Sequence, residues 1–178
     1  NEVVQFGSRS STSSISGITP NFLHVRSFDI SNGRFISKED VNSARNVIVL
    51  GPDLKEKLFP YNQAIGSNIR VKDQSFKVIG VMEPKGAVFG NNQDENAYVP
   101  LTTMVSRLTG RDPTFGVSLS FISVEAKDEK NTRAAKFQIT NLLRQRHKIN
   151  RDDDFAVRSQ KDALTIVSNI TGGLTLML

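Results

Sequence analysis

Two stretches decide the fold of this chain: residues 46–60, NVIVLGPDLKEKLFP, and residues 65–86, IGSNIRVKDQSFKVIGVMEPKG. The first begins with a short apolar run that closes at a glycine, which predicts a strand. Pro52 suits the first position of a helix, where its missing N–H costs nothing. Leu54 and Leu58 then lie four residues apart on one face of that helix, which the next proline ends. We therefore expect a strand followed directly by a two-turn helix.

The second stretch predicts a β-hairpin over residues 69–82. Apolar and polar residues alternate on both sides of Asp73 and Gln74, which can form the turn. One face of the hairpin should therefore be buried. Gly66 and Gly80 mark its edges, where a bend or a close backbone approach usually requires glycine.

These residues resemble the extracytoplasmic core domain of MacB-type ABC transporter permeases, within the wider family that also contains the FtsX-like permeases. Three phrases carry the resemblance: VIVLGPDLKEKLFP (residues 47–60), the hairpin stretch, and DENAYVPLTT (residues 94–103). The likeness can be followed from Gly17 to Gln160.

The resemblance implies an α+β fold with two small subdomains. Residues 1–35 and 110–162 would form a βαβ "porter"-like unit, incomplete at its N-terminus, and residues 36–109 an inserted mixed α/β unit. The missing first part of the porter unit should leave an open sheet edge or an exposed apolar helix face.

Outside the two central stretches, periodicity predicts several further elements. The Ser-rich segment 8–16 has the composition of a loop. Residues 117–124 and 155–158 are expected to be strands, and Thr102 or Thr103 is expected to cap a short helix. The strongest helical pattern spans residues 131–147, with its expected core residues Ala135, Ile139, Leu142 and Leu143.

The last residues, 163–178, carry no charge. This run is shorter than the roughly 18 to 20 apolar residues that span a bilayer. The resemblance favours the start of a truncated membrane helix here, and a buried or amphipathic C-terminal helix is the alternative.

The composition of the chain argues against some functions but does not identify one. The chain has 178 residues, no Cys, and 23 Lys and Arg against 18 Asp and Glu, which gives a net charge of +5. The densest basic segment, residues 144–148, sits at an expected helix end, where cations complement the helix dipole. The aromatic residues do not interleave with basic ones, so a base-stacking platform and a nucleic-acid partner are not expected. A soluble basic nucleic-acid binder remains an alternative, which a salt titration against DNA would test, because phosphate contacts make the affinity fall steeply with salt.

Nothing in the sequence indicates an enzyme. His24 and His147, the two histidines, have no second ligand at metal-binding spacing, and Asp152–Asp154 lack the pattern of a calcium loop. No phosphate-binding glycine motif and no nucleophile elbow are present. We expect no catalytic residue, no cofactor and no metal, and any ATPase activity should reside on a separate nucleotide-binding domain.

The resemblance implies a non-catalytic domain that transmits ATP-driven conformational change during efflux. Its implied partners are a periplasmic adaptor, an outer-membrane channel reached through the adaptor, the ATP-binding domain, and a second copy in a homodimeric transporter. The implied location is the periplasmic side of the inner membrane. The alternative is a regulatory or sensing module of a related FtsX or lipoprotein-release type permease.

One loop, between residues 85 and 95, is a candidate contact for a partner. It is rich in glycine and asparagine, which permit positive φ, and it carries two apolar residues. Those apolar residues either fix the loop internally or contact the adaptor. The candidate contact residues are Val88, Phe89, Gly90, Asn91 and Asn92.

Overall fold

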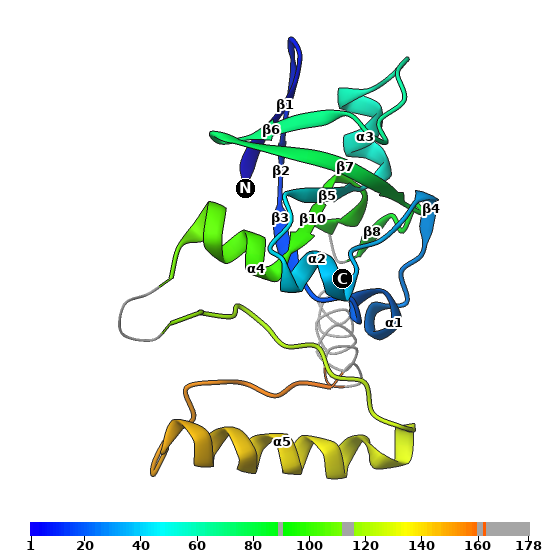
Figure 1. The fold of residues 1–178 in the computed structure, drawn as a ribbon. Helices are drawn as coiled ribbons and strands as arrows, with labels where there is room; N and C mark the ends of the chain where they lie inside the picture. Colours follow the sequence, from blue (N-terminus) through cyan, green and yellow to red (C-terminus); the bar gives the residue numbers. More distant parts are fainter. Residues whose placement is uncertain (89–90, 112–115, 160–161, 163–178) are drawn as a thin grey trace, which may run out of the picture. The chain divides into compact units, whose positions relative to one another are not determined.

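The computed structural model describes residues 1–88, 91–111, 116–159 and 162 (Figure 1). Contacts divide the chain into two compact units, Asn1–Ser123 and Val124–Leu178, and each is described by itself. The predicted mixed class of strands and helices is confirmed. The strands are β1 (Glu2–Phe6), β2 (Arg9–Ser13), β3 (Ile15–Ile18), β4 (Ile30–Gly33), β5 (Val47–Leu50), β6 (Asn68–Val71), β7 (Gln74–Met82), β8 (Ala87–Val88), β9 (Asn91–Asn92) and β10 (Ala97–Pro100).

The helices of the first unit are short. They are α1 (Phe22–Arg26), α2 (Lys38–Asn42), α3 (Pro52–Leu58), the 3-10 turn Gln93–Glu95, and α4 (Leu101–Thr103), which continues as a π-helical segment, Met104–Thr109. The second unit contains the 3-10 turn Glu129–Asn131 and the long helix α5 (Thr132–His147).

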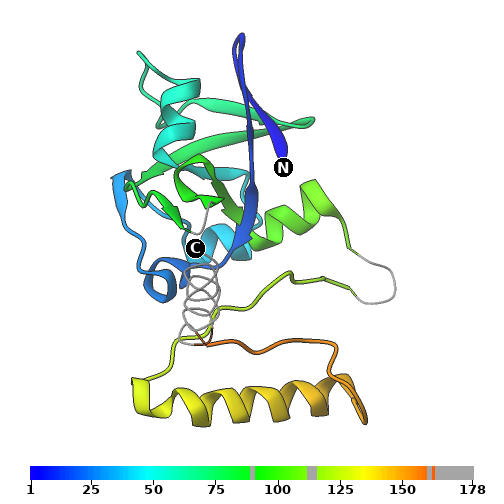
Figure 2. The same cartoon turned by 180° about the vertical axis from the view of Figure 1, so that it is seen from behind.

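A single sheet organises the first unit. Its strand order is β2-β1-β6-β7-β5-β10-β3, with β4 paired to β7 beside this path. Most neighbours are antiparallel, but β5 runs parallel to β7 and β3 runs parallel to β10. Only Ser14 separates β2 from β3, so the two ends of the strand order belong to one nearly continuous stretch of chain. Figures 1 and 2 show β1 and β2 as a long hairpin whose tip extends beyond the other strands.

The predicted hairpin is confirmed as β6 and β7. Its turn lies one residue earlier than expected, because Val71 pairs with Gln74 and Lys72 adopts φ 52°. Both predicted glycine roles are also found. Gly66 has φ 88°, and a Cβ on Gly80 would lie 2.4 Å from a carbonyl oxygen of the neighbouring chain segment.

Two hydrophobic clusters pack on the strands of this sheet. The strand predicted at residues 46–50 is β5, and all four of its residues are buried. The first cluster includes α3 and the hairpin, through Val4, Ile48, Leu50, Leu54, Leu58, Phe59, Ile69, Val71, Phe76 and Val78. The second includes the segments around α1 and α2, through Ile18, Phe28, Ile36, Val47, Val49, Ile79, Met82 and Tyr98.

Helix α2 begins with a reciprocal cap and a buried carboxylate. Ser37 accepts from the Asp40 N–H, and Asp40 Oδ2 accepts from the Ser37 N–H at 2.9 Å. Asp40 is fully buried and binds Arg34 through two hydrogen bonds of 2.6 and 3.1 Å. These hydrogen bonds lower the pKa of Asp40 from 3.8 to about 2, and the bond with Arg34 contributes most.

Several predicted elements are corrected. The Ser-rich segment 8–16 is not a loop, because residues of β2 form a regular ladder with β1. Residues 117–124 and 155–158 are not strands. The first of these segments is exposed, with Phe121 at 62%, and no described strand hydrogen-bonds to either. Thr102 and Thr103 do not cap α4; their hydroxyls donate to the carbonyls of Val41 and Arg45.

The helix predicted at residues 131–147 is present as α5, but it has no buried residue within its compact unit. Leu142 is 52% exposed, which corrects its placement in a core. The structure also brings β1–β4, from residues 1–35, into the same sheet as residues 36–109. This grouping differs from the division that the resemblance implied. The residues expected to begin a membrane helix, 163–178, lie outside the described part of the chain.

The first prediction concerns the buried carboxylate. A group whose folded pKa is depressed stabilises the fold above its unfolded pKa, and this contribution is lost as the pH falls toward the folded pKa. We expect Asp40→Asn to lower the free energy of unfolding by about 1–2 kcal/mol at neutral pH, a value discounted because Arg34 is half exposed. The difference in the free energy of unfolding between Asp40→Asn and the original protein should become smaller as the pH falls from about 4 to about 2. Chemical denaturation at several pH values between about 4 and 2 measures this difference. Glu39→Gln, at an exposed neighbouring position, is the control. A gap that does not change with pH would contradict the assignment.

The second prediction compares two leucines. Leu54 is fully buried on α3, so Leu54→Ala should cost about 2–5 kcal/mol of stability. Leu142→Ala should cost less than about 1 kcal/mol, because half of its side chain is already in water. Thermal unfolding of both variants tests this difference. An equal loss in the two would mean that α5 packs as tightly as α3.

Candidate functional site

The described residues contain no cluster of His, Cys, Asp and Glu that could hold a metal ion. His147 Nδ1 lies 2.9 Å from Asp154 Oδ1, and its ring contacts Phe155 edge-on. Asp153 pairs instead with Arg144 at 2.8 Å. Asp153 and Asp154 therefore bind different partners, and the described residues show no convergence of these aspartates on one point.

The predicted contact loop has a well-defined base. Asp94, nearly buried, accepts from the Lys85 N–H at 2.7 Å and the Gly86 N–H at 3.0 Å. The Asp94 N–H in turn binds Asn92 Oδ1 at 3.0 Å. The sequence predicted no regular structure here, but β8 and β9 form a short antiparallel pair in which Val88 faces Asn91.

Side chains also tie this base to α3. Asn92 Nδ2 donates to Asp53 Oδ2 at 2.9 Å. Lys57 Nζ lies 2.9 Å from Glu95 Oε1. Residue 51, just before α3, donates its N–H to the carbonyl of Asn96 at 2.8 Å. The loop base and α3 are therefore held together along the length of the helix.

The five predicted contact residues divide into three groups. Asn92 has an internal role, because its side chain fixes the loop to α3. Val88 and Asn91 are placed by their backbones in β8 and β9. Phe89 and Gly90 lie outside the described residues. The sequence analysis missed Asp94, which holds the base of the loop. The signal in the sequence for this role is its position two residues after Asn92, whose side chain accepts from the Asp94 N–H.

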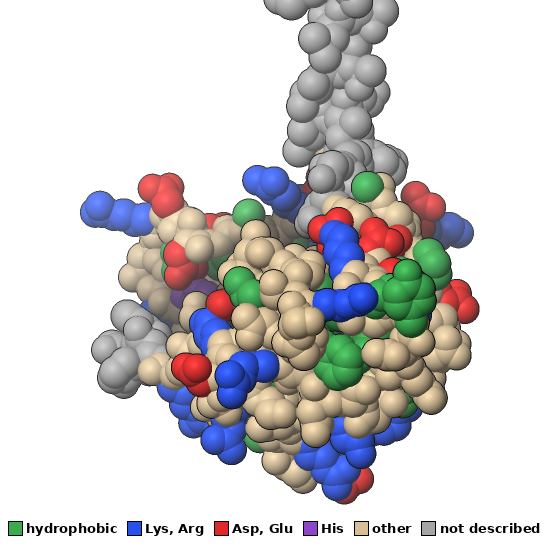
Figure 3. All heavy atoms as spheres, turned by 90° about the horizontal axis from the view of Figure 1, so that it is seen from above, with side chains coloured by type: hydrophobic (Ala, Val, Ile, Leu, Met, Phe, Trp, Pro, Cys, Tyr) green, Lys and Arg blue, Asp and Glu red, His purple; other side chains and the backbone are tan. Residues whose placement is uncertain are grey.

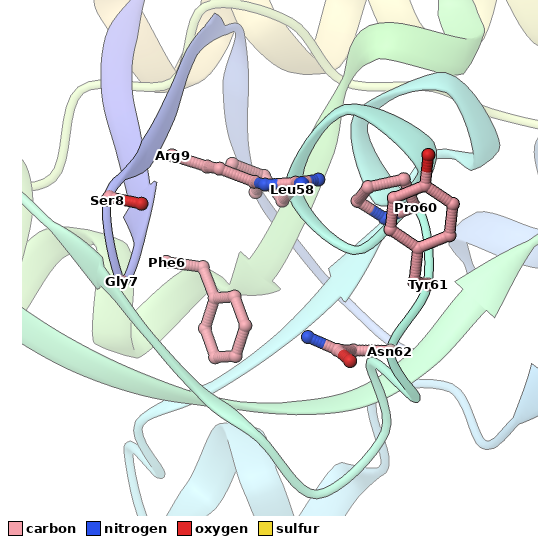
Figure 4. A pocket seen from close by; sticks show the side chains of 8 residues that line it. All are labelled: Phe6, Gly7, Ser8, Arg9, Leu58, Pro60, Tyr61 and Asn62. Carbon is pink, nitrogen blue, oxygen red and sulfur yellow. The ribbon is translucent and has the colours of Figure 1, made fainter.

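The sequence analysis also missed a pocket at the other end of α3. It has a volume of about 220 Å³ and lies between the β1–β2 turn and the segment after α3. Figure 4 shows Phe6 and Arg9 from the hairpin on one side, with Pro60, Tyr61 and Asn62 opposite. These two segments are about fifty residues apart in the sequence, and reading residues 8–16 as a loop concealed the first of them.

The pocket combines an apolar floor with an exposed aromatic rim. Leu58 is buried, and the ring of Phe6 packs on the ring of Phe59 with centroids 4.1 Å apart. Tyr61 is 92% exposed. The guanidinium of Arg9 lies 6.0 Å from the centroid of the Tyr61 ring. Figure 3 looks down on this end of the molecule, where hydrophobic side chains lie in small separate areas among Lys and Arg side chains.

A membrane-spanning helix is not found in the described part of the chain: none of its helices is both long enough and apolar enough.

Comparison with known proteins places the chain in a family. Residues 1–142 match the family described as MacB-like periplasmic core domain. The macrolide export ATP-binding/permease protein MacB of Shewanella sp. (strain W3-18-1) is 27% identical over 190 residues, which cover 98% of this chain and 28% of that protein. The MacB protein of Neisseria meningitidis serogroup A is 30% identical over 167 residues, covering 94% of this chain and 25% of that protein.

Solved structures show the same fold. The periplasmic region of MacB from Actinobacillus actinomycetemcomitans superposes with a TM-score of 0.75 at 24% identity, covering 94% of this chain and 72% of that one. The extracellular domain of the noncanonic ABC-type transporter YknZ from Gram-positive bacteria gives a TM-score of 0.66 at 16% identity, covering 83% of this chain and 71% of that one.

These findings define a periplasmic domain of the class found in ABC transporter permeases. The chain belongs to the family of MacB-like periplasmic core domains, which confirms the resemblance seen in the sequence. It spans only about a quarter of the length of the curated relatives it matches.

The third prediction concerns Asp94. Asp94→Ala removes the acceptor for two backbone N–H groups at the loop base, so the amides of Lys85 and Gly86 should exchange with solvent faster. Hydrogen exchange read by NMR measures this at single residues. Asp29→Ala, at an exposed position, is the control and should leave both rates unchanged. Unchanged rates in Asp94→Ala would contradict the role given to Asp94.

Proposed function

We propose that this domain transmits ATP-driven movement from the transporter to a periplasmic adaptor and, through the adaptor, to an outer-membrane channel. Efflux is the class of activity, in keeping with the word export in the names of the relatives. The observation that supports the proposal best is the attachment of the 85–95 loop to α3. A partner held by this loop would be linked to the packed core through Leu54 and Leu58.

The mechanical part of the proposal depends on rigidity. Protein interiors are close-packed and transmit strain with little compression. The central strand β5 has all four residues buried, and the two hydrophobic clusters share the sheet that contains it. A push on one side of such a body moves the whole body, as a domain that relays motion requires.

The remaining parts of the proposal concern the other components. ATP binding and hydrolysis belong to a separate nucleotide-binding domain, since the sequence holds no phosphate-binding motif. The full transporter works as a homodimer, and nucleic acid is not a partner. A domain that binds no adaptor would instead fit a regulatory or sensing module of the FtsX or lipoprotein-release type.

The fourth prediction tests the adaptor contact. Val88→Ser, Phe89→Ser and Asn91→Ala, combined in one variant of the full transporter, should weaken adaptor binding by at least about 1 kcal/mol. The melting temperature should stay unchanged, because the loop base is held by Asp94 and Asn92. Titration with the soluble part of the adaptor encoded in the same genome measures the affinity, and calorimetry measures the melting temperature.

Lys38→Ala, an exposed position on α2, is the matched control and should change neither quantity. The opposite pattern, a lower melting temperature with unchanged affinity of the folded fraction, would show that the apolar residues fix the loop internally. The adaptor would then bind elsewhere.

A further inference from the structure

The pocket beside the β1–β2 turn has a shape and chemistry of its own. Its volume of about 220 Å³ lies below the roughly 300–1,000 Å³ of sites that enclose a small molecule. It is large enough for one or two side chains of a protein. The turn that forms one wall is open, because a Cβ on Gly7 would meet no atom within 4 Å.

The charge of the pocket indicates which chemical group it can bind. Arg9 is the charged residue among those that line it, and it contacts the ring of Tyr61. Its distance of 6.0 Å from the Tyr61 ring centroid is at the outer limit of a cation–π contact. The guanidinium therefore keeps its donors available for a carboxylate, which it can bind through two parallel hydrogen bonds.

The apolar groups of the pocket indicate a second feature of the partner, an apolar side chain. Tyr61 is 92% exposed, and exposed Tyr and Arg are the residue types that contribute most to protein interfaces. Phe6 and Leu58 provide an apolar floor between them. An apolar side chain seated on this floor, next to a carboxylate that reaches Arg9, would satisfy both features.

The pocket is close to the other candidate contact. Tyr61 follows the C-terminal end of α3, and Asp53, which binds Asn92, lies in its first turn. A helix of seven residues is about 10 Å long. One partner of ordinary interface size, about 800 Å² on each side, can therefore cover both ends of α3.

We propose that this pocket docks a loop of a protein partner that presents an apolar side chain next to a carboxylate. Resting on the proposed function, we assign that loop to the adaptor, which would contact the 85–95 loop and the pocket together. A lipid surface fits less well, because the pocket is concave, contains the polar side chains of Ser8 and Asn62, and offers a single cation.

The test uses the full transporter in lipid nanodiscs, titrated with the soluble part of the adaptor. Tyr61→Ala and Arg9→Ser should each weaken binding at least about fivefold. Arg9→Lys should weaken it less than Arg9→Ser, because the cation remains without its planar pair of donors. The loss in Arg9→Ser should shrink at high salt, which screens the carboxylate contact. Both changed positions, Arg9 and Tyr61, are exposed, so the melting temperatures of the three variants should not change.

Lys77→Ala, an exposed cation on β7, is the control and should bind as the original protein does. Tyr61→Ala and Arg9→Ser binding normally would overturn this inference and leave the proposed function intact. A failure of the original protein to bind the adaptor would overturn the proposed function and the inference with it. Binding of the nanodisc-held transporter to vesicles of phosphatidylethanolamine and phosphatidylglycerol, lost in Tyr61→Ala, would assign the surface to lipid and overturn the inference.

Discussion

The burial of β5 on both faces is the constraint on which the rest of the first unit depends. Ile48 and Leu50 belong to one hydrophobic cluster, and Val47 and Val49 belong to the other. Because successive side chains of a strand point to opposite faces, a shift of one residue would exchange the two sets. Pairing of β5 with β7 and β10 thus fixes both cores at once, and α3 follows directly from the end of β5.

Sequence reasoning succeeded where local signals and burial agree. The β6–β7 hairpin and α3 each depend on residues close in sequence, and each was found. It failed where pairing with another strand, and not the composition of the segment, decides the outcome. Segment 8–16 has loop-like composition but forms β2, since an edge strand needs few apolar residues once its neighbour supplies the ladder. Segment 117–124 has the alternation of a strand, yet a strand also needs a neighbour for its N–H and C=O groups.

The same distinction applies to the candidate site. The glycines and asparagines between residues 85 and 95 indicated a loop that stands apart from regular structure, and a short antiparallel pair occupies its described part. The sequence could not show that Asn92 binds Asp53, because the two lie 39 positions apart. The pocket could not be predicted from the sequence for the same reason, since its walls come from the β1–β2 turn and from the residues that follow α3.

Helix α3 has a double role that its sequence makes possible. Its inward face, Leu54 and Leu58, packs in the first hydrophobic cluster, and its outward residues Asp53 and Lys57 bind the base of the 85–95 loop. A helix this short is unstable alone, so its position is set by packing and not by its own hydrogen bonds. Any partner that holds the outer face of α3 therefore holds a part whose place is determined by the core. Movement of that core, under the proposed function, reaches the partner through α3 without a flexible joint between them.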